Sequence, residues 1–263
     1  MAEPYIWSKL GTQDYPMVNH CVQSEASDWP HQLLHLSFPF CQWLGSTRHS
    51  GVGLKIAMIR ALVAERAQAF TRAISSHLKR LAGEGVGEVL SRLDEQETGA
   101  ASVLIPEPTT LPVLNHLDSC LKEASLFDAA ISQAIADLRP YLQWRQSKAY
   151  NDALLGTGFI ENYGWCELIG PNGFFKGNDF LLGLLILGPN THYRDHFHPA
   201  PELYWPLTSN TEWRKGDEKL TPKASGTIIW HQPNVIHATK TGAAPLLTIW
   251  SWTRDTATPA RLV

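Results

Sequence analysis

Three features are missing from this sequence, and each absence argues against a class of protein. No two cysteines form a CxxC pair, which argues against a zinc knuckle or a disulfide framework. No apolar run reaches the roughly 20 residues that a membrane-spanning helix needs. The first thirty residues hold no basic segment followed by an apolar one, so we expect no signal peptide. We therefore expect a protein of the reducing cytoplasm with four free, mostly buried cysteines, namely Cys21, Cys41, Cys120 and Cys166.

An excess of charge of either sign is also missing. The net charge is −3, charged residues make up 18% of the chain, and no basic run is present. This balance argues against nucleic acid as a partner. Hydrophobic residues make up 44% of the 263 positions, which is ordinary for a globular protein. The length suits one domain, or a domain with an extension, and is ample for a core.

The N-terminal half of the chain has helical periodicity. Apolar residues recur near every 3.6 positions over 53–81, and two glycines end this pattern. Further helices are expected near 86–93, 110–125 and 127–146, and Pro140 is expected to kink or restart the last of them. We predict that residues 1–150 form a mostly helical region that packs on the outside of the second half.

The pattern changes at about residue 148. Short runs rich in β-branched, aromatic and leucine residues follow, and Gly-Pro-Asn and Gly-Asp turn signals separate them. Short strands at roughly 8–12-residue spacing are typical of a sandwich or barrel. We predict a mainly β fold with a helical N-terminal extension, in which residues 151–258 form a double-stranded β-helix of the jelly-roll type. The expected strands cover 159–169, 180–187, 203–207, 211–215, 226–230, 237–239 and 245–253.

The segment from Thr191 to Trp205 concentrates residues that can bind a metal. His196 and His198 are two apart, so on a strand both imidazoles reach the same point. Glu202 follows after two prolines, which favour an extended or turning path that could bring its carboxylate to the imidazoles. Two imidazoles and a carboxylate suit a borderline divalent ion. The residue types do not choose among Zn²⁺, Fe²⁺, Mn²⁺, Ni²⁺ and Co²⁺.

A fourth candidate ligand lies downstream. His237 follows a buried strand and a turn at 232–234, and we expect it to open the next strand. Taken alone, His192 and His231 are interpreted as ordinary strand residues with satisfied hydrogen bonds. The predicted metal site consists of four side chains, namely His196, His198, Glu202 and His237.

This pattern resembles the two metal-binding motifs of the cupin superfamily. With Tyr193 and Tyr204 included, it is similar to the motif of the cupin-type dimethylsulfoniopropionate (DMSP) lyases and their lyase-like relatives, over roughly residues 155–256. The second motif departs from the general cupin form, because Pro233 precedes His237 by four residues with no glycine between them. The resemblance implies a metal held by three histidines and a glutamate, with the two tyrosines beside it.

Tyr204 is the expected general base. It lies two residues after Glu202, so on a strand it shares the face of that ligand. A phenol is a poor base at neutral pH because its usual pKa is about 10, but a nearby dication favours the phenolate. The resemblance implies that a tyrosine near the metal removes the α-proton of DMSP, so that dimethyl sulfide leaves and acrylate remains. Tyr193 is expected to bind substrate or to relay a proton.

Tryptophan is unusually frequent, with ten residues in the chain. A sulfonium is a permanent cation without hydrogen-bond donors, and aromatic faces hold such a group best. We expect substrate contacts from tryptophans of the β region, although each one, taken singly, could instead fill the barrel core. The candidates are Trp205, Trp230, Trp250 and Trp252.

Two other interpretations of the motif stay open at this point. Another cupin enzyme, either a non-haem iron dioxygenase or a sugar isomerase or epimerase, would use the same metal motif without needing the two tyrosines. A non-catalytic small-molecule-binding cupin would have a structural metal or none. The expected partner is a small carboxylate that carries a sulfonium, and neither nucleic acid nor a membrane is expected. The helical layer could be the interface of a homodimer or a lid.

Overall fold

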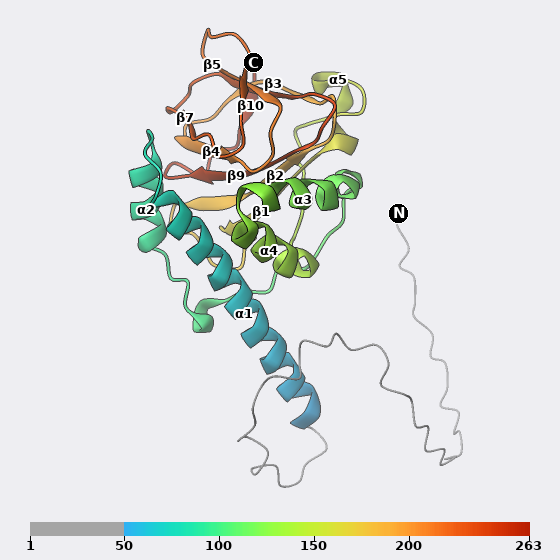
Figure 1. The fold of residues 1–263 in the computed structure, drawn as a ribbon. Coiled ribbons are helices and arrows are strands. Elements are labelled where there is room, and N and C mark those ends of the chain that lie inside the picture. The colour runs from blue at the N-terminus through green and yellow to red at the C-terminus, as the bar shows by residue number, and fades with distance from the viewer. Residues whose placement is uncertain (1–49) are drawn as a thin grey trace, which may run out of the picture. The chain divides into compact units, whose positions relative to one another are not determined.

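The computed structural model describes residues 50–263, with side chains from residue 53 onward. These residues fall within one compact unit (Figure 1). Cys21 and Cys41 lie outside the described residues, and the predicted boundary between residues 150 and 151 stays a prediction. None of the described helices is both long enough and apolar enough to cross a bilayer.

Helices make up the first part of the described chain. The predicted helix over 127–146 is interrupted at Pro140, as expected, because proline cannot continue an α-helix and here lies in a separate 3₁₀ turn. No helix follows that turn as far as residue 146. The side chain of Asp128 accepts a hydrogen bond from the backbone N–H of Ile131 at 3.0 Å and caps the start of this helix. The α-helices are α1 (Ser50–Leu78), α2 (Val86–Asp94), α3 (Leu117–Phe127), α4 (Ala129–Leu138) and α5 (Asp152–Leu155). The 3₁₀ helices are η2 (Ala100–Ser102), η3 (Pro112–His116), η4 (Arg139–Tyr141) and η5 (Ile160–Asn162).

The apolar stripe predicted along α1 is buried only in its C-terminal part. Val63, Phe70 and Ile74 are fully buried, whereas Leu54 and Ile59 are 51% and 47% exposed. The periodicity therefore located the helix correctly but not the length of its buried face. In Figure 1 the first turns of α1 extend away from the strands.

Within residues 50–263, ten strands form two five-stranded antiparallel sheets. Sheet 1 has the order β1-β2-β9-β4-β7, and sheet 2 has the order β10-β3-β8-β5-β6. The chain crosses between the sheets after β3, so the His-rich segment begins in sheet 2 and ends in sheet 1. The strands are β1 (Tyr163–Ile169), β2 (Leu181–Leu187), β3 (His192–Phe197), β4 (Glu202–Pro206), β5 (Thr211–Lys215), β6 (Thr221–Lys223), β7 (Ile229–His231), β8 (His237–Thr241), β9 (Leu246–Trp252) and β10 (Arg261–Leu262).

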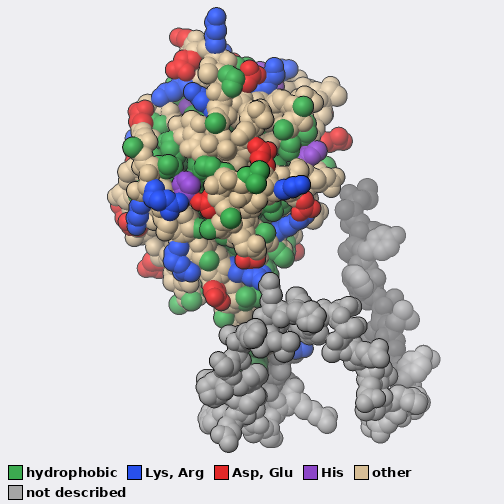
Figure 2. Space-filling model, viewed as in Figure 1, with side chains coloured by type: hydrophobic (Ala, Val, Ile, Leu, Met, Phe, Trp, Pro, Cys, Tyr) green, Lys and Arg blue, Asp and Glu red, His purple; other side chains and the backbone are tan. Residues whose placement is uncertain are grey.

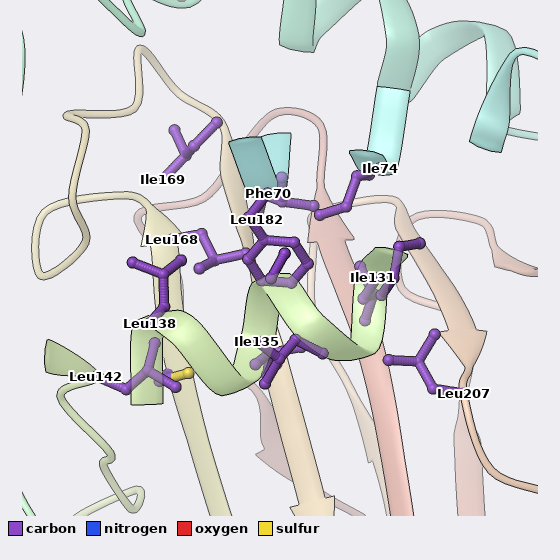
Figure 3. Packing of buried hydrophobic residues seen from close by; sticks show 14 of the residues in the cluster. Phe70, Ile74, Ile131, Ile135, Leu138, Leu142, Leu168, Ile169, Leu182 and Leu207 are labelled. Carbon is purple, nitrogen blue, oxygen red and sulfur yellow. The ribbon is translucent and has the colours of Figure 1, made fainter. Parts of the chain in front are cut away.

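Sheet 1 is covered on both faces, which explains its nearly continuous apolar runs. Its outer face packs against the helices, and Figure 3 shows side chains of α1 and α4 meeting side chains of β1 and β2. Its inner face is turned toward sheet 2 (Figure 1). Alternation along β4 separates the two environments, because Leu203 and Trp205 belong to the outer core while Tyr204 belongs to the inner cluster.

The architecture confirms the predicted fold class, a mainly β jelly-roll with a helical N-terminal region.

Basic and acidic side chains are interspersed on the face of the described chain that Figure 2 shows.

Candidate active site

Two cross-strand pairs, one from each sheet, bring the candidate ligands together. In sheet 2, His196 of β3 lies opposite His237 of β8. In sheet 1, Glu202 of β4 lies opposite His231 of β7. Residues directly opposite each other in a sheet project to the same face, so each pair turns inward as a unit. His198 lies in the segment that links β3 to β4 and completes the group.

The Oε2 atom of Glu202 is the centre of this group. It lies 3.2 Å from Nε2 of His198 and 3.2 Å from Nε2 of His237. It is also 3.6 Å from Nδ1 of His231, which is beyond hydrogen-bond distance. All four side chains are buried, and one ligand atom each from His198, Glu202 and His237 lies within 4.8 Å of the others.

Backbone carbonyls fix the tautomers of three of these histidines. Nδ1 of His196 is 2.8 Å from the carbonyl oxygen of Arg194, and the corresponding distances are 2.8 Å for His198 to Ala200 and 2.9 Å for His237 to Val235. A carbonyl oxygen only accepts, so each Nδ1 carries the proton and donates it. In a neutral ring the lone pair then lies on Nε2. This is the arrangement in which an outer carbonyl orients a metal-binding histidine.

The arrangement fits a bound cation. Two Nε2 lone pairs that face one carboxylate oxygen at 3.2 Å repel it, unless each carries a second proton or a cation lies between them. Nitrogen and oxygen ligands bound at about 2.1 Å to one ion are themselves roughly 3.0–3.4 Å apart. The observed spacing and the donor set therefore suit a divalent transition ion.

His196 lies beside this group rather than in it. Its ring stacks on Tyr193, with 3.9 Å between the ring centroids, and its centroid is 4.1 Å from that of His237. Burial, followed by the neighbouring His237, holds the pKa of His196 well below its usual range. The ring is thus neutral, and its Nε2 keeps a lone pair for a metal.

Two side chains that the sequence did not single out for this purpose support Glu202. Trp252 donates from Nε1 to Oε1 of Glu202 at 2.8 Å, which leaves Oε2 for the histidines. His231 stacks on His237 at a centroid distance of 4.0 Å, and neither of its ring nitrogens has a hydrogen-bond partner among the described residues. Burial opposes the charge on Glu202, but the facing His198, His231 and His237 outweigh it and hold the pKa of this carboxyl well below its usual range.

Tyrosines occupy the adjoining wall. Tyr204 projects from β4 on the same side as Glu202, which precedes it by two residues. Burial, followed by the charge of Glu202, raises the pKa of Tyr204 well above its usual value. Tyr193 is also buried, and its hydroxyl lies 2.9 Å from that of Tyr150. Tyr163 completes the cluster, with its ring centroid 5.5 Å from that of Tyr193.

These side chains border a cavity of about 360 Å³ between the two sheets. Trp250 and Trp252 line it, as expected. Trp205 and Trp230 do not, because alternation turns them to the outer face of sheet 1. The remaining lining residues come from β1, β2 and three loops, and the full set is Ser147, Tyr150, Tyr163, Trp165, Glu167, Pro171, Leu181, Leu185, Tyr193, Glu202, Tyr204, Trp250, Trp252, Thr256, Ala257, Pro259 and Ala260.

A family model described as dimethylsulfoniopropionate lyase matches residues 87–248, which is more than half of the chain. The chain belongs to the DMSP lyase family. Dimethylsulfoniopropionate lyase DddQ of Ruegeria pomeroyi is 26% identical over 158 residues, which cover 59% of this chain and 78% of DddQ. Family membership agrees with the resemblance that the His-rich segment and its two tyrosines indicated.

Two solved structures of DMSP lyases share the fold. A chain from the crystal structures of the DMSP lyases RdDddP and RnDddQII superimposes with a TM-score of 0.59 at 22% identity, over 76% of this chain and 99% of that one. The crystal structure of DddQ from Ruegeria pomeroyi gives a TM-score of 0.57 at 21% identity, over 74% and 96% of the two chains. The helical region and the jelly-roll are thus both features of DMSP lyase structures.

Proposed function

We propose that this member of the DMSP lyase family is a carbon–sulfur lyase that cleaves DMSP to dimethyl sulfide and acrylate by β-elimination. One observation carries the proposal: the buried phenol of Tyr204 borders the same aromatic cavity as Glu202, the carboxylate around which the histidines gather. Family membership favours this activity over a cupin dioxygenase, a sugar isomerase or epimerase, or a binding protein.

Four side chains would hold the divalent ion. His198, Glu202 and His237 already place ligand atoms together, and the neutral His196 ring lies next to His237. His231 would position Glu202 from the opposite strand without being a ligand itself. A bound dication supplies positive charge that attracts the substrate carboxylate, makes the adjacent C–H more acidic and favours the phenolate of a nearby tyrosine. The choice among Zn, Fe, Mn, Ni and Co stays open to metal analysis.

Tyr204 is proposed to move the proton. Its phenolate oxygen takes the α-proton of DMSP, and the electron pair of that C–H bond forms the C=C bond of acrylate. The C–S bond breaks at the same time, and its electron pair leaves with sulfur as neutral dimethyl sulfide. Burial of Tyr204 excludes water from the base, but it also raises the pKa, so the phenolate depends on nearby positive charge.

Tyr193 is proposed to bind the substrate and to pass the proton on. Its hydroxyl is within hydrogen-bond distance of that of Tyr150, at 2.9 Å, so two phenols form a chain along the cavity wall. Burial raises the pKa of both hydroxyls, which keeps them protonated and able to donate. Substrate contact is proposed for Trp250 and Trp252, which line the cavity.

A cytoplasmic location is proposed as well. Cys120 and Cys166 are free and buried, and burial, followed by the charge of Glu123, raises the pKa of Cys120 to about 12. Such thiols are unreactive and suit a reducing compartment. Whether the helical layer is the interface of a homodimer or a lid stays open.

The test is direct measurement of dimethyl sulfide and acrylate in equal amounts from DMSP and the metal-loaded protein. Tyr204→Phe should keep the fold and the bound metal but lose at least 100-fold in kcat, because a positioned base contributes roughly 10²–10⁴-fold. Tyr141→Phe, which changes a tyrosine outside the cavity, is the matched control and should keep full activity. Absence of dimethyl sulfide from every metal-loaded sample would contradict the proposal.

A further inference from the structure

One row of sheet 1 places a carboxylate opposite an indole with nothing between them but glycine. Glu167 of β1 pairs with Gly183 of β2, and Gly183 pairs with Trp250 of β9. The outer two strands of this row are about 10 Å apart, which is twice the usual strand spacing. Only glycine fits at the middle position, since a Cβ atom on Gly183 would lie 1.9 Å from the carbonyl oxygen of Cys166 and 3.0 Å from Cε2 of Trp250.

The walls of the cavity carry negative charge only. Glu167 and Glu202 are its two carboxylates, and no Lys or Arg is found among the described residues that line it. Glu202 is committed to the histidines and to Trp252. Glu167 is therefore the free charge of this cavity, at the end formed by β1, three strands away from Glu202.

Glu167 is buried without a cationic partner. Its side chain accepts two hydrogen bonds from Asn172, from the backbone N–H at 2.7 Å and from Nδ2 at 3.1 Å, and it forms no ion pair with any described residue. The nearest cation in this network is Arg145, which donates to Oδ1 of Asn172 and lies 5.8 Å above the ring of Trp165. Arg145 does not line the cavity. A buried carboxylate in this state is stabilised by a cation that enters the cavity.

Aromatic rings line the cavity beside Glu167. Trp165 and Trp250 meet edge to face with 6.0 Å between their centroids, and Trp250 and Trp252 do so at 5.9 Å. Trp165 stands on β1 two residues before Glu167, so both project into the cavity. Indole faces attract cations, and methylated cations in particular are recognised by such cages because they need no hydrogen-bond acceptor.

We propose that Glu167, together with Trp165 and Trp250, forms the subsite for a methylated onium group. The inference rests on the proposed function, because it assigns the two ends of the substrate: the carboxylate lies toward Glu202 and the histidines, and the onium lies toward Glu167 and Trp165. The substrate class is then a short carboxylate with a permanent methylated cation on the β-carbon. A carboxylate and aromatic faces do not distinguish a sulfonium from a quaternary ammonium group, so quaternary ammonium analogues also bind. A primary ammonium is disfavoured, because its three N–H donors would meet indole faces.

A pair of isosteres tests this subsite without any turnover of DMSP. The cation 3-(trimethylammonio)propionate and the neutral 4,4-dimethylpentanoate differ only in nitrogen against carbon at one position. Calorimetric titration of the metal-loaded wild type should show about tenfold tighter binding of the cationic compound, a ratio typical of a desolvated cation at aromatic faces. Glu167→Gln should lower that ratio at least threefold through weaker binding of the cation, with the affinity for the neutral compound unchanged within twofold.

Glu161→Gln is the matched control, because Glu161 is exposed and outside the cavity. It should keep the wild-type ratio. Equal affinity of the wild type for both compounds would overturn the subsite, as would an unchanged ratio in a folded Glu167→Gln variant. If that variant does not fold, the wild-type ratio alone decides. If the wild type prefers the cationic compound but releases no dimethyl sulfide from DMSP, the proposed reaction is refuted and the subsite stands. If it releases dimethyl sulfide but binds both compounds equally, only the subsite is refuted.

Discussion

The two faces of sheet 1 come from the same strands but differ in how their polar groups are treated. The outer face holds Leu203, Trp205 and Ile249 against the helices in an apolar core. The inner face holds Glu202 and Tyr204 beside a cavity. On the helical side the buried charge is satisfied, because Asp128 is bonded to both His77 and Ile131. On the inner side, by contrast, His231 has no hydrogen-bond partner among the described residues.

The difference shows where stability and function are separated in this fold. Period-2 alternation lets one strand supply the core with one set of residues and the site with the next. Among the described residues, Nε1 of Trp205 is the buried side-chain atom without a partner on the outer face, whereas on the inner side both ring nitrogens of His231, Nε2 of His237 and Nε1 of Trp250 lack one. Unsatisfied polar groups thus concentrate on the inner side, as expected of a functional surface. Neighbouring residues on one strand should therefore give opposite phenotypes when they are changed.

The largest contrast is expected between Glu202 and Leu203. Glu202→Gln removes the charge around which three histidines gather, so the metal content should fall below a tenth of the wild-type value. The rate of dimethyl sulfide release should fall at least 1000-fold, because the loss of a ligand removes the Lewis acid. Leu203→Ala should instead cost about 2–5 kcal/mol of unfolding free energy, with metal content unchanged in the folded protein. Metal analysis, activity assays and urea denaturation measure the three quantities. A Glu202→Gln protein that keeps its metal would contradict the assignment.

Much of this contrast could be predicted from the sequence. Each predicted strand overlaps an observed one, and 211–215 coincides with β5. Hydrophobic periodicity and turn residues are local signals, and they located these elements. No bounds were predicted for β3, β6 or the two-residue β10, and β10 exists only through its pairing with β3, more than sixty residues earlier. The break after α4 could be predicted, because the effect of Pro140 on a helix is local.

The residues of the site also divide into those that local spacing predicts and those that depend on strand pairing. Spacing alone indicated His196, His198 and Glu202, which lie within seven positions. The role of His231 depends on β7 pairing with β4, and that of Glu167 on β1 and β9 flanking β2. Such register is set by tertiary contacts and cannot be obtained from local spacing. One signal was available for His231: it lies two residues after Ile229, so strand alternation would have turned both inward.

The tryptophans offer a second test of the two faces. Trp205→Leu should cost about 3 kcal/mol of unfolding free energy, because Trp205 is fully buried between His77 and Phe127. Its effect on KM for DMSP should be within twofold. Trp250→Leu should raise KM about tenfold through loss of a cation–π face, with a smaller loss of stability, since one side of the ring borders the cavity. The reverse pattern in chemical denaturation and steady-state kinetics would show that the cavity is not the binding site.

A substitution of His231 tests the residues that position the metal ligands rather than the ligands themselves. His231→Gln should weaken metal affinity about 10- to 100-fold, as is typical when a residue that orients a metal ligand is changed. The measurement is competition with a chelator, which does not depend on turnover. His192→Gln is the matched control, because His192 is an exposed histidine on β3, and its metal affinity should equal that of the wild type. An unchanged affinity in His231→Gln would show that Glu202 is held by Trp252 alone.

The smallest effect is expected on the helical side, at Asp128. Burial opposes the charged form of this carboxyl, but hydrogen bonds from Ile131 and His77 outweigh it and lower the pKa below its usual value. A pKa that is lower in the folded than in the unfolded state contributes stability above about pH 4, and this contribution is lost as the pH falls through the folded pKa. Asp128→Asn keeps a capping side chain, so it should cost only about 1 kcal/mol at pH 7. The cost should shrink as denaturation is measured at pH values progressively below 4. A loss of unfolding free energy that does not depend on pH would mean that packing, rather than the charge of Asp128, connects α1 to α4 at this point.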